Sequence, residues 1–362
     1  MNSRLNKLKA LLLEKNLDGA LISSVPNIIY LTNFAHFSTH EREAFVIVTQ
    51  NKNFIITDKR YSHAVRKNVE DLELLELSSE YTIPHLIGEV VTNEQIKKLG
   101  IESTNLTVHE WDKIKTLAEE TKHFDLSPIR VIKDSKEIAF IQKACELGDQ
   151  AFTHILTHIK EGMTEKEVAF ELEHFIRKNG ADISFSSIIA FEENAAIPHH
   201  KTGNRKLERG NLILLDFGVK YEEYCSDMTR TICFGKATEE KKKIHQTVLE
   251  AQEKAISFLN SQFSTLNSVP ASEVDGEARN YIITQERPSI PHSLGHGIGL
   301  EVHEAPNLSP RSKDELKEGM VFSIEPGIYL NDNCGVRIED LFTIEGRKLI
   351  QLTQSPKELI EV

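Results

Sequence analysis

Four acidic residues and one histidine in the second half of this chain have the types and surroundings of a metal site. Each acidic residue lies inside or beside an apolar stretch, where an unpaired charge is costly. Lysine and arginine are sparse in these stretches, so bound cations are the simplest compensation. Two divalent ions cancel four negative charges, which predicts a dinuclear site. The candidate ligands are Asp216, Asp227, His296, Glu325 and Glu339.

The first two candidates belong to one predicted β-hairpin, residues 208–234, which turns near Lys220–Glu223. Side chains on one face of paired strands lie close together, so Asp216 and Asp227 are expected to face the same side. Two solvated aspartates at a sheet edge are the alternative. The apolar run LILLDFGV around Asp216 argues against that alternative.

Histidines gather in the segment HSLGHGIGLEVHE, residues 292–304. Glycines alternate on both sides of His296 and allow the backbone to pack closely around its imidazole. Most of the fifteen histidines in the chain must be structural or lie on the surface. His292, His296 and His303, which lie close together and are interleaved with glycine, nevertheless indicate a functional site.

Two further segments complete the set. Glu325 follows an apolar strand and precedes Pro-Gly, which indicates a turn. Arg337 and Glu339 lie two residues apart in a predicted strand and therefore share a face. Arg337 either forms a plain salt bridge or, if Glu339 binds metal, holds the carboxylate of Glu339 in place. Asp340 should point to the opposite face and have a structural role.

Upstream of the hairpin, His199 and His200 follow an Ile-Pro pair. Neighbouring side chains in an extended chain point to opposite sides, so at most one of these histidines should enter the site. From the residues alone, two loop histidines without a catalytic role are the favoured interpretation.

The ligand set is rich in oxygen, with one nitrogen and no sulfur. Such a set favours a harder divalent ion, Mn²⁺ first, over the nitrogen and sulfur sites typical of zinc. Two such ions can activate a shared water, polarise a carbonyl and hold both reacting groups. The sequence therefore predicts hydrolytic chemistry.

Composition limits the other classes of function. The 362 residues are 40% hydrophobic and carry a net charge of −12 without a basic stripe, so we expect no nucleic-acid partner. No stretch approaches the roughly 18 apolar residues of a membrane span, and we expect no membrane association. The N-terminal apolar run is too short for a signal peptide. The four cysteines form no close-spaced motif, so reduced thiols in a cytoplasmic protein are expected. Cys225 is interpreted as a packing residue.

The order of predicted elements indicates an α+β fold with two domains. The first is an α/β unit with a helix over residues 4–16, a buried strand over 18–23 and a hairpin within 44–57. Capping boxes at Asp134 and Thr164 begin two helices after a connection at residues 127–130. Two more helices, at 238–260 and from 272, precede short strands. We expect helices on one face of a curved, mostly antiparallel sheet.

The motifs LLDFG, SDMTRT, HSLGHGIGLEVHE, SIEPGIY and GVRIED occur in this order along the chain. With these motifs the chain resembles the Xaa-Pro peptidases, aminopeptidase P and prolidase, of the pita-bread metallopeptidases that include methionine aminopeptidase. The resemblance covers nearly the whole sequence. It implies a creatinase-type N-terminal α/β domain over residues 1–130 and a pita-bread catalytic domain over residues 135–362.

The resemblance also implies how the ligands divide between two ions, most naturally Mn²⁺, with Co²⁺ or Zn²⁺ as alternatives. Asp216 would bind one ion, and Asp227 and Glu339 would bridge both. His296 and Glu325 would complete the other ion. Glu325 would in addition act as general base toward the attacking water.

Four further residues take catalytic roles by resemblance. His199 matches the Pro-His loop of the family and would contact the scissile amide. His292 and His303 would stabilise the tetrahedral intermediate. Arg337 matches the arginine beside the last glutamate.

The resulting expectation is a dinuclear exopeptidase that hydrolyses the N-terminal Xaa-Pro bond of peptides, an Xaa-Pro aminopeptidase, acting as a homodimer. The alternatives are an Xaa-Pro dipeptidase, or prolidase, that acts on dipeptides only, and an aminopeptidase of broader specificity. Metal-free relatives include peptide-binding modules and creatinase. They are disfavoured because all five ligands are present here.

Overall fold

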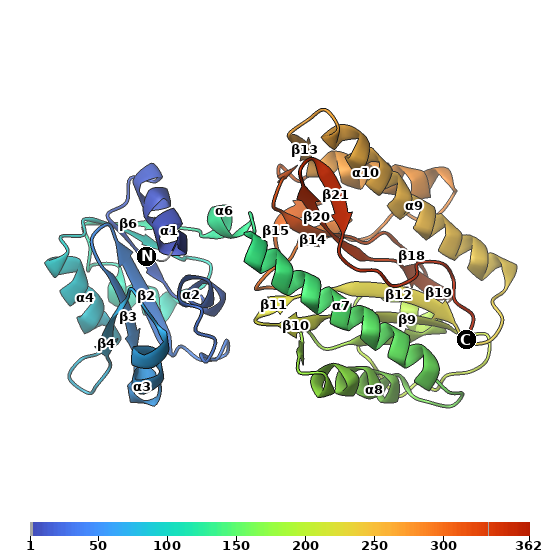
Figure 1. Ribbon diagram of the computed structural model, residues 1–362, viewed down its shortest axis with the longest axis horizontal. Coiled ribbons are helices and arrows are strands. Elements are labelled where there is room, and N and C mark those ends of the chain that lie inside the picture. Colours follow the sequence, from blue (N-terminus) through green and yellow to red (C-terminus); the bar gives the residue numbers. More distant parts are fainter. Residues whose placement is uncertain (1–2, 332) are drawn as a thin grey trace. The chain divides into compact units, whose positions relative to one another are not determined.

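The computed structural model describes residues 3–331 and 333–362 (Figure 1). The chain separates into two compact units, Met1–Arg130 and Val131–Val362, which are called unit 1 and unit 2 below. The predicted connection is a short helix, α6 (Ser127–Arg130), at the end of unit 1. No helix in the described part of the chain is both long and apolar enough to cross a bilayer.

Unit 1 is built on one mixed sheet of six strands in the order β4-β3-β2-β1-β5-β6. The predicted hairpin is present as an antiparallel β2–β3 pair, and the predicted strand β1 is fully buried beside β2. Apolar residues of the sheet, among them Ile47 and Leu99, pack in one cluster with Val90 of α4. The strands are β1 (Gly19–Ile22), β2 (Ala44–Thr49), β3 (Asn53–Thr57), β4 (Glu73–Glu76), β5 (Lys98–Ile101) and β6 (Glu120–His123). The helices are α1 (Ser3–Glu14), α2 (Val25–Thr32), α3 (Lys59–Asn68), α4 (Ile83–Asn93) and α5 (Val108–Ile114).

Unit 2 contains four long helices in two pairs. Both predicted capping boxes are present: the Asp134 carboxylate accepts from the backbone of Glu137, and the Thr164 hydroxyl accepts from the backbone of Glu167. In each box the glutamate side chain returns a bond to the backbone of the capping residue, which satisfies donors at the helix start. The helices are α7 (Ser135–His158), α8 (Glu165–Lys178), α9 (Glu239–Phe263) and α10 (Ala271–Thr284).

The strands of unit 2 form several small sheets rather than one continuous sheet. All strand pairs among its described residues are antiparallel, as the sequence predicts. A five-stranded sheet has the order β15-β14-β17-β20-β21, and two three-stranded sheets have the orders β12-β9-β8 and β11-β10-β7. The strands are β7 (Asp182–Ile183), β8 (Ile188–Phe191), β9 (Leu212–Phe217), β10 (Val219–Tyr221), β11 (Tyr224–Cys225), β12 (Met228–Cys233), β13 (Ser268–Pro270), β14 (Gly295–Gly297), β15 (Glu304–Leu308), β16 (Glu315–Lys317), β17 (Val321–Ile324), β18 (Gly327–Leu330), β19 (Cys334–Arg337), β20 (Asp340–Glu345) and β21 (Lys348–Gln351).

The hairpin that carries Asp216 and Asp227 differs from the prediction of two continuous strands. It breaks into β9–β12 at its base and β10–β11 at its tip, which belong to different sheets. The break lies at Gly218, where an added Cβ would lie 2.0 Å from Ser184 Oγ and 2.1 Å from Ser226 O. The strand bends there because only glycine allows the backbone segments to approach so closely.

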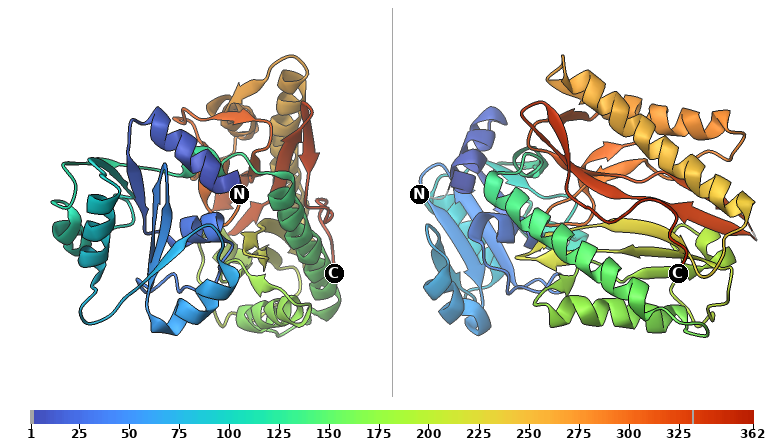
Figure 2. Two further views of the ribbon diagram at one scale, coloured as in Figure 1. Left: turned by 60° about the vertical axis from the view of Figure 1, so that its left-hand side comes forward. Right: turned by 45° about the vertical axis from the view of Figure 1, so that its right-hand side comes forward.

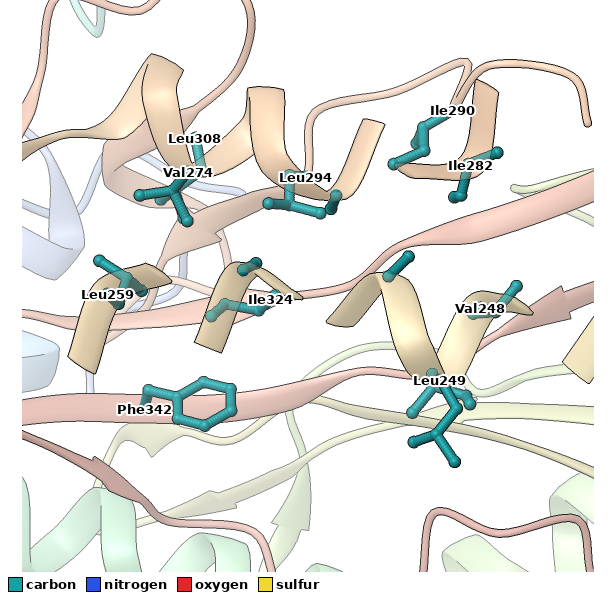
Figure 3. Packing of buried hydrophobic residues seen from close by; sticks show 14 of the residues in the cluster. Val248, Leu249, Leu259, Val274, Ile282, Ile290, Leu294, Leu308, Ile324 and Phe342 are labelled. Atoms are coloured by element: carbon teal, nitrogen blue, oxygen red, sulfur yellow. The ribbon is translucent and has the colours of Figure 1, made fainter. Parts of the chain in front are cut away.

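The helix pairs cover the five-stranded sheet and the sheet β12-β9-β8. Residues of α9 and α10, including Val248 and Val274, pack on Ile324 and Phe342 of β17 and β20 (Figure 3). Residues of α7 and α8 pack in the same way on β8, β9 and β12. Within unit 2, Figures 1 and 2 both show α7 beside α8 and α9 beside α10. Strand side chains that point away from the helices are therefore available for a site.

Candidate metal centre

Alternation along β9 directs Asp216 away from the helices. Ile213, Leu215 and Phe217 pack into the apolar cluster with α7 and α8. Leu214 and Asp216 alternate with them and therefore lie on the other face. Asp216 is 7% exposed and lines a cavity of about 810 Å³.

The register of β9 and β12 brings the second aspartate to the same face. Thr229 lies directly opposite Asp216, and Asp227 lies two residues before Thr229. Residues two apart share a face in an extended chain. Asp227 lines the same cavity as Asp216 and is 5% exposed.

His296 and Glu325 approach from two neighbouring strands, β14 and β17. The His296 imidazole Nε2 lies 3.3 Å from Glu325 Oε1 and 3.8 Å from Asp227 Oδ2. The glycine before His296 allows this approach: an added Cβ on Gly295 would lie 2.0 Å from the carbonyl oxygen of Ser323. The expected close packing of backbone around His296 therefore has a defined location, between β14 and β17.

Arg337 contacts a different carboxylate from the expected one. Its guanidinium Nη2 donates to Asp216 Oδ2, and its Nε donates to Thr229 Oγ1 at 3.0 Å. Thr229 Oγ1 in turn donates to Glu339 Oε2 at 2.7 Å. The prediction that Arg337 holds the Glu339 carboxylate is therefore wrong for direct contact, since Thr229 stands between them.

Two carboxylate oxygens of the site lack any partner within the described residues. They are Asp227 Oδ1 and Glu339 Oε1, and both are buried. One ligand atom each of Asp227, His296 and Glu339 lies within 4.8 Å of the other two. Unpaired buried carboxylate oxygens in a cavity fit divalent cations, which carry the missing positive charge.

The electrostatics support this reading of the carboxylates. Burial, followed by the charges of Glu339, Asp216 and Glu325, raises the pKa of Asp227 well above its ordinary value. Burial and the charges of Glu325 and Asp216 raise the pKa of Glu339 to about 8. Burial also raises the pKa of Asp216, although Arg337 opposes this effect. Buried carboxylates that raise one another's pKa in this way do not all ionise unless added cations compensate their charges.

His296 pairs with two of the candidate ligands, and its shorter contact is with Glu325. Burial alone would raise the pKa of Glu325, but the hydrogen bond and charge of His296 bring it below its ordinary value. Burial would lower the pKa of His296, and the hydrogen bond with Glu325 raises it instead to about 9. Without metal, the His296 proton therefore occupies the place that a cation would take.

All three remaining histidines line the cavity, but they differ in their contacts. His292 Nδ1 donates to the Ser293 carbonyl at 2.7 Å, and its Nε2 accepts from the Tyr329 hydroxyl at 2.9 Å. Both nitrogens of His292 are therefore in use. By contrast, the imidazoles of His199 and His303 have no hydrogen-bond partner among residues 3–331 and 333–362, and His303 lies against His296 with ring centroids 4.3 Å apart.

His200 points elsewhere. Its Nε2 lies 2.9 Å from Glu165 Oε2, a fully buried carboxylate at the start of α8. Glu165 also accepts from Asn194 and from the backbone of Phe191. Of the two neighbouring histidines, only His199 reaches the cavity.

Three site residues were missed from the sequence. Thr229 links Arg337 to Glu339 through hydrogen bonds with both. Ser323 Oγ accepts from the His296 backbone and donates to Glu325, and the Tyr329 hydroxyl accepts from Arg337 Nη1 at 2.8 Å. Each lies two or four residues from a predicted ligand in an extended segment. That spacing was the available signal, because such residues share the ligand's face.

Two residues expected outside the site lie outside it. Cys225 packs with Tyr224 and Ile298, and burial raises the pKa of its thiol to about 12. Asp340, directly after Glu339, forms an ion pair with Arg230 at 2.6 Å on the side away from the cavity.

With this geometry established, similarities to known proteins identify the family. Residues 139–346 match the model of metallopeptidase family M24, and residues 4–134 match the creatinase/prolidase N-terminal domain. The chain is 35% identical to the Xaa-Pro dipeptidase of Pyrococcus horikoshii over 99% of both chains.

Two solved structures resemble the chain along its whole length. The Xaa-Pro dipeptidase from Bacillus anthracis is 34% identical, with a TM-score of 0.91 and 99% of both chains covered. The X-Pro aminopeptidase from Thermotoga maritima is 32% identical, with a TM-score of 0.85, covering 99% of this chain and 100% of that one. The predicted pita-bread fold with a creatinase-type N-terminal domain is confirmed. The chain belongs to metallopeptidase family M24 and is a metallo-exopeptidase that uses divalent metal ions.

Proposed function

We propose that this protein is a dinuclear Xaa-Pro peptidase that acts as a dipeptidase, a prolidase, with Mn²⁺ as its working ion. Its ligands are Asp216, Asp227, His296, Glu325 and Glu339. The observation that carries the proposal is the pair of buried, unpartnered oxygens on Asp227 and Glu339, two residues that line the cavity. Buried polar atoms in proteins nearly always have a partner, and in a cavity a bound cation can supply it.

The charges favour two ions over one. Arg337 offsets part of the charge of Asp216, so the protein itself supplies one fixed positive charge to four carboxylates. Three negative charges are left, and a single divalent ion cannot cancel them. Two ions exceed them by one charge, which an anionic substrate group or a deprotonated nucleophile can balance.

The chain's own residues divide the chemical work. Divalent ions bound here supply Lewis acidity, which activates water and polarises a carbonyl. Glu325 accepts the proton of the attacking water, a role that fits a carboxylate kept ionised by its neighbours. His199 and His303, whose imidazoles are unoccupied by protein partners, donate to the substrate and to the developing oxyanion. His292 does not have a free nitrogen to donate to the intermediate, as was expected of it, because Tyr329 and Ser293 already bind both of its nitrogens.

The cavity also supports recognition of proline. Its wall includes the apolar side chains of Phe185, Ile188 and Val302. A proline ring gains contact with such a wall, and its tertiary amide needs no acceptor for an N–H. Proline-containing peptides are therefore the proposed substrates.

The sequence favoured the aminopeptidase activity, and the relatives favour the dipeptidase. The Pyrococcus horikoshii and Bacillus anthracis proteins, both similar over the whole length, are Xaa-Pro dipeptidases. The X-Pro aminopeptidase from Thermotoga maritima keeps the second activity as the competing candidate. The choice depends on whether residues after the proline are accepted.

One set of substrates tests both parts of the proposal. The measurement is kcat/KM of the Mn²⁺-loaded protein on Ala-Pro, Ala-Pro-Ala and Ala-Ala-Ala. A prolidase cleaves Ala-Pro and leaves both tripeptides nearly intact. Efficient cleavage of Ala-Pro-Ala would make the protein an aminopeptidase. Efficient cleavage of Ala-Ala-Ala, at the same rate as Ala-Pro-Ala, would contradict proline specificity, because losing the ring should cost roughly 10–200-fold.

A further inference from the structure

A second group of ligand-type side chains lies away from the cavity, on the α7–α8 pair. His154 and His158 lie one turn apart at the end of α7, so both side chains project from the same face of that helix. Glu171 on α8 completes the group. One ligand atom of each residue lies within 4.8 Å of the other two. The catalytic proposal uses none of them.

We infer that His154, His158 and Glu171 form an additional binding site for a divalent ion that prefers imidazole, with Zn²⁺ as the best match. Two nitrogens and one carboxylate oxygen are a ligand set typical of zinc, with water as the fourth ligand. The set is the reverse of the main centre, where four carboxylates accompany one histidine. The two centres should therefore differ in metal preference.

The side chains are already oriented for such an ion. His154 Nε2 and Glu171 Oε1 are 2.7 Å apart, and the His154 ring stacks on Phe175 of α8 with centroids 4.4 Å apart. His158 Nδ1 lies 2.8 Å from the His154 carbonyl oxygen. A carbonyl only accepts, so Nδ1 carries the proton. The Nε2 lone pair of His158 can then bind a metal ion. A hydrogen bond from the other ring nitrogen to a carbonyl, as here from Nδ1, commonly accompanies metal-binding histidines.

Access and charge also suit the site. His154 and Glu171 side chains are 21% and 31% exposed, and His158 is exposed, so an ion can enter directly from solvent. Tetrahedral bonds of about 2.1 Å require ligand atoms about 3.4 Å apart, so small side-chain rotations are sufficient. The hydrogen bond from His154 keeps the pKa of Glu171 below its ordinary value, and the nearby His158 and His174 act in the same direction.

An ion at this position would join the end of α7 to the middle of α8. This helix pair covers the sheet that contains β9 and β12. Zn²⁺ should consequently raise the midpoint of thermal unfolding of unit 2, since an ion that binds only the folded state stabilises it. Occupancy of this helix-pair site should not itself change the chemistry in the cavity.

The test is the number of Zn²⁺ ions retained per chain after equilibration with buffered Zn²⁺, measured by elemental analysis. The full-length parent should retain one ion more than H158A and than E171Q, and both variants should hydrolyse Ala-Pro at parental rates when loaded with Mn²⁺. The affinity lost at this site should exceed the roughly 10–100-fold that removal of an outer contact costs.

A matched control is H85A. His85 belongs to a surface pair with Glu89 on α4 of unit 1, at 3.3 Å, and has no second histidine beside it. This variant should retain the parental number of Zn²⁺ ions. Equal counts in the parent and H158A would overturn the proposal. So would a loss in H158A that E171Q does not share, or the same loss in H85A.

Discussion

Glu339 and Asp340 are neighbours in the sequence, both almost fully buried, yet the protein treats their charges in opposite ways. Asp340 accepts from Arg230 and Thr353 at 2.6 Å and from Gln252 at 2.9 Å, and it pairs with Lys357 at 3.0 Å. Burial would raise its pKa, but Arg230 and Lys357 bring the pKa below its ordinary value.

Glu339, one residue earlier, has one hydrogen bond from Thr229, an unpartnered Oε1 and a pKa raised to about 8. Asp340 therefore belongs to a closed region, where protein cations neutralise the carboxylate. Glu339 belongs to an open region, where the carboxylate lines the cavity and can bind a ligand. Burial alone does not distinguish them. What distinguishes them is whether each oxygen has a partner and whether it faces the cavity. His199 and His200 differ in the same way: His199 lines the cavity, and His200 pairs with Glu165.

Removal of metal is the largest perturbation of the open region. A chelator should abolish hydrolysis of Ala-Pro, and Mn²⁺ or Co²⁺ should restore it, because Glu325 as general base does not replace the Lewis acidity of the ions. Activity is measured before and after dialysis, with metal content checked by elemental analysis. Full turnover in a verified metal-free sample would show that the open carboxylates do not serve metal.

Exchanging each neighbour for its amide should separate the two regions. E339Q removes a ligand charge and should lower kcat/KM by more than about 100-fold, beyond the cost of losing an outer contact. In the metal-free protein it should cost little stability, since the lost charge was unpaired. The readouts are turnover with Mn²⁺ and urea unfolding without metal.

D340N should show the reverse pattern in stability. It leaves the buried Arg230 and the partly buried Lys357 without their anion, which should lower the free energy of unfolding by about 3–5 kcal/mol. Under conditions in which D340N is folded, it should still bind the parental amount of metal. Circular dichroism is the suitable probe of unfolding, because the one tryptophan, Trp111, belongs to unit 1. Equal stability losses in E339Q and D340N would show that the two carboxylates do not differ in how the protein compensates their charges.

The histidine pair tests the same division with smaller effects. H199A should lower kcat by roughly 10²-fold, the lower end for a lost proton donor, with bound metal unchanged. H200A should keep turnover but leave Glu165 Oε2 with one partner fewer, which should cost about 1–3 kcal/mol of stability. The opposite pattern in turnover would show that His200 is the residue that serves the substrate.

Much of this arrangement could be predicted because its causes are local. The capping boxes at Asp134 and Thr164 and the hairpin within residues 44–57 depend on residues within a few positions of each other. The candidate ligands were found for a related reason: a charge inside an apolar run is visible without any structure. Alternation similarly assigned His199 and His200 to opposite sides.

What could not be predicted depends on contacts between distant segments. Arg337 was assigned to Glu339 by spacing, but the pairing of β9 with β12 brings Asp216 and Thr229 to it instead. The break in the hairpin at Gly218 results from Ser184, more than thirty residues away. Such contacts follow from the register of the strands, which a single sequence does not state.

His245 on α9 sharpens the criterion, because among the described residues its ring has an unpartnered nitrogen outside the cavity. Its Nε2 is buried without a partner, and burial lowers its pKa to about 4, with Arg230 acting in the same direction and the Thr231 backbone and Glu358 opposing. Below pH about 6.5 the unfolded chain binds a proton at this histidine and the folded chain does not. The free energy of unfolding therefore falls as the pH falls from about 6.5 toward 4.

The expected size of this loss is at most about 2 kcal/mol between pH 7 and pH 5, given 1.36 kcal/mol per pKa unit. The measurement is urea unfolding of metal-free protein at both pH values, for the parent and for H245Q, which cannot take up a proton. Titration of the carboxylates in the cavity is common to both proteins and cancels in the difference. If the parent and H245Q lose the same stability, His245 is not held neutral by its surroundings. If the parent loses more stability than H245Q, the buried, unpartnered nitrogen of His245 is a cost to the fold and not a binding site. A buried polar atom without a partner then indicates function only where it lines the cavity, as in Asp227 and Glu339.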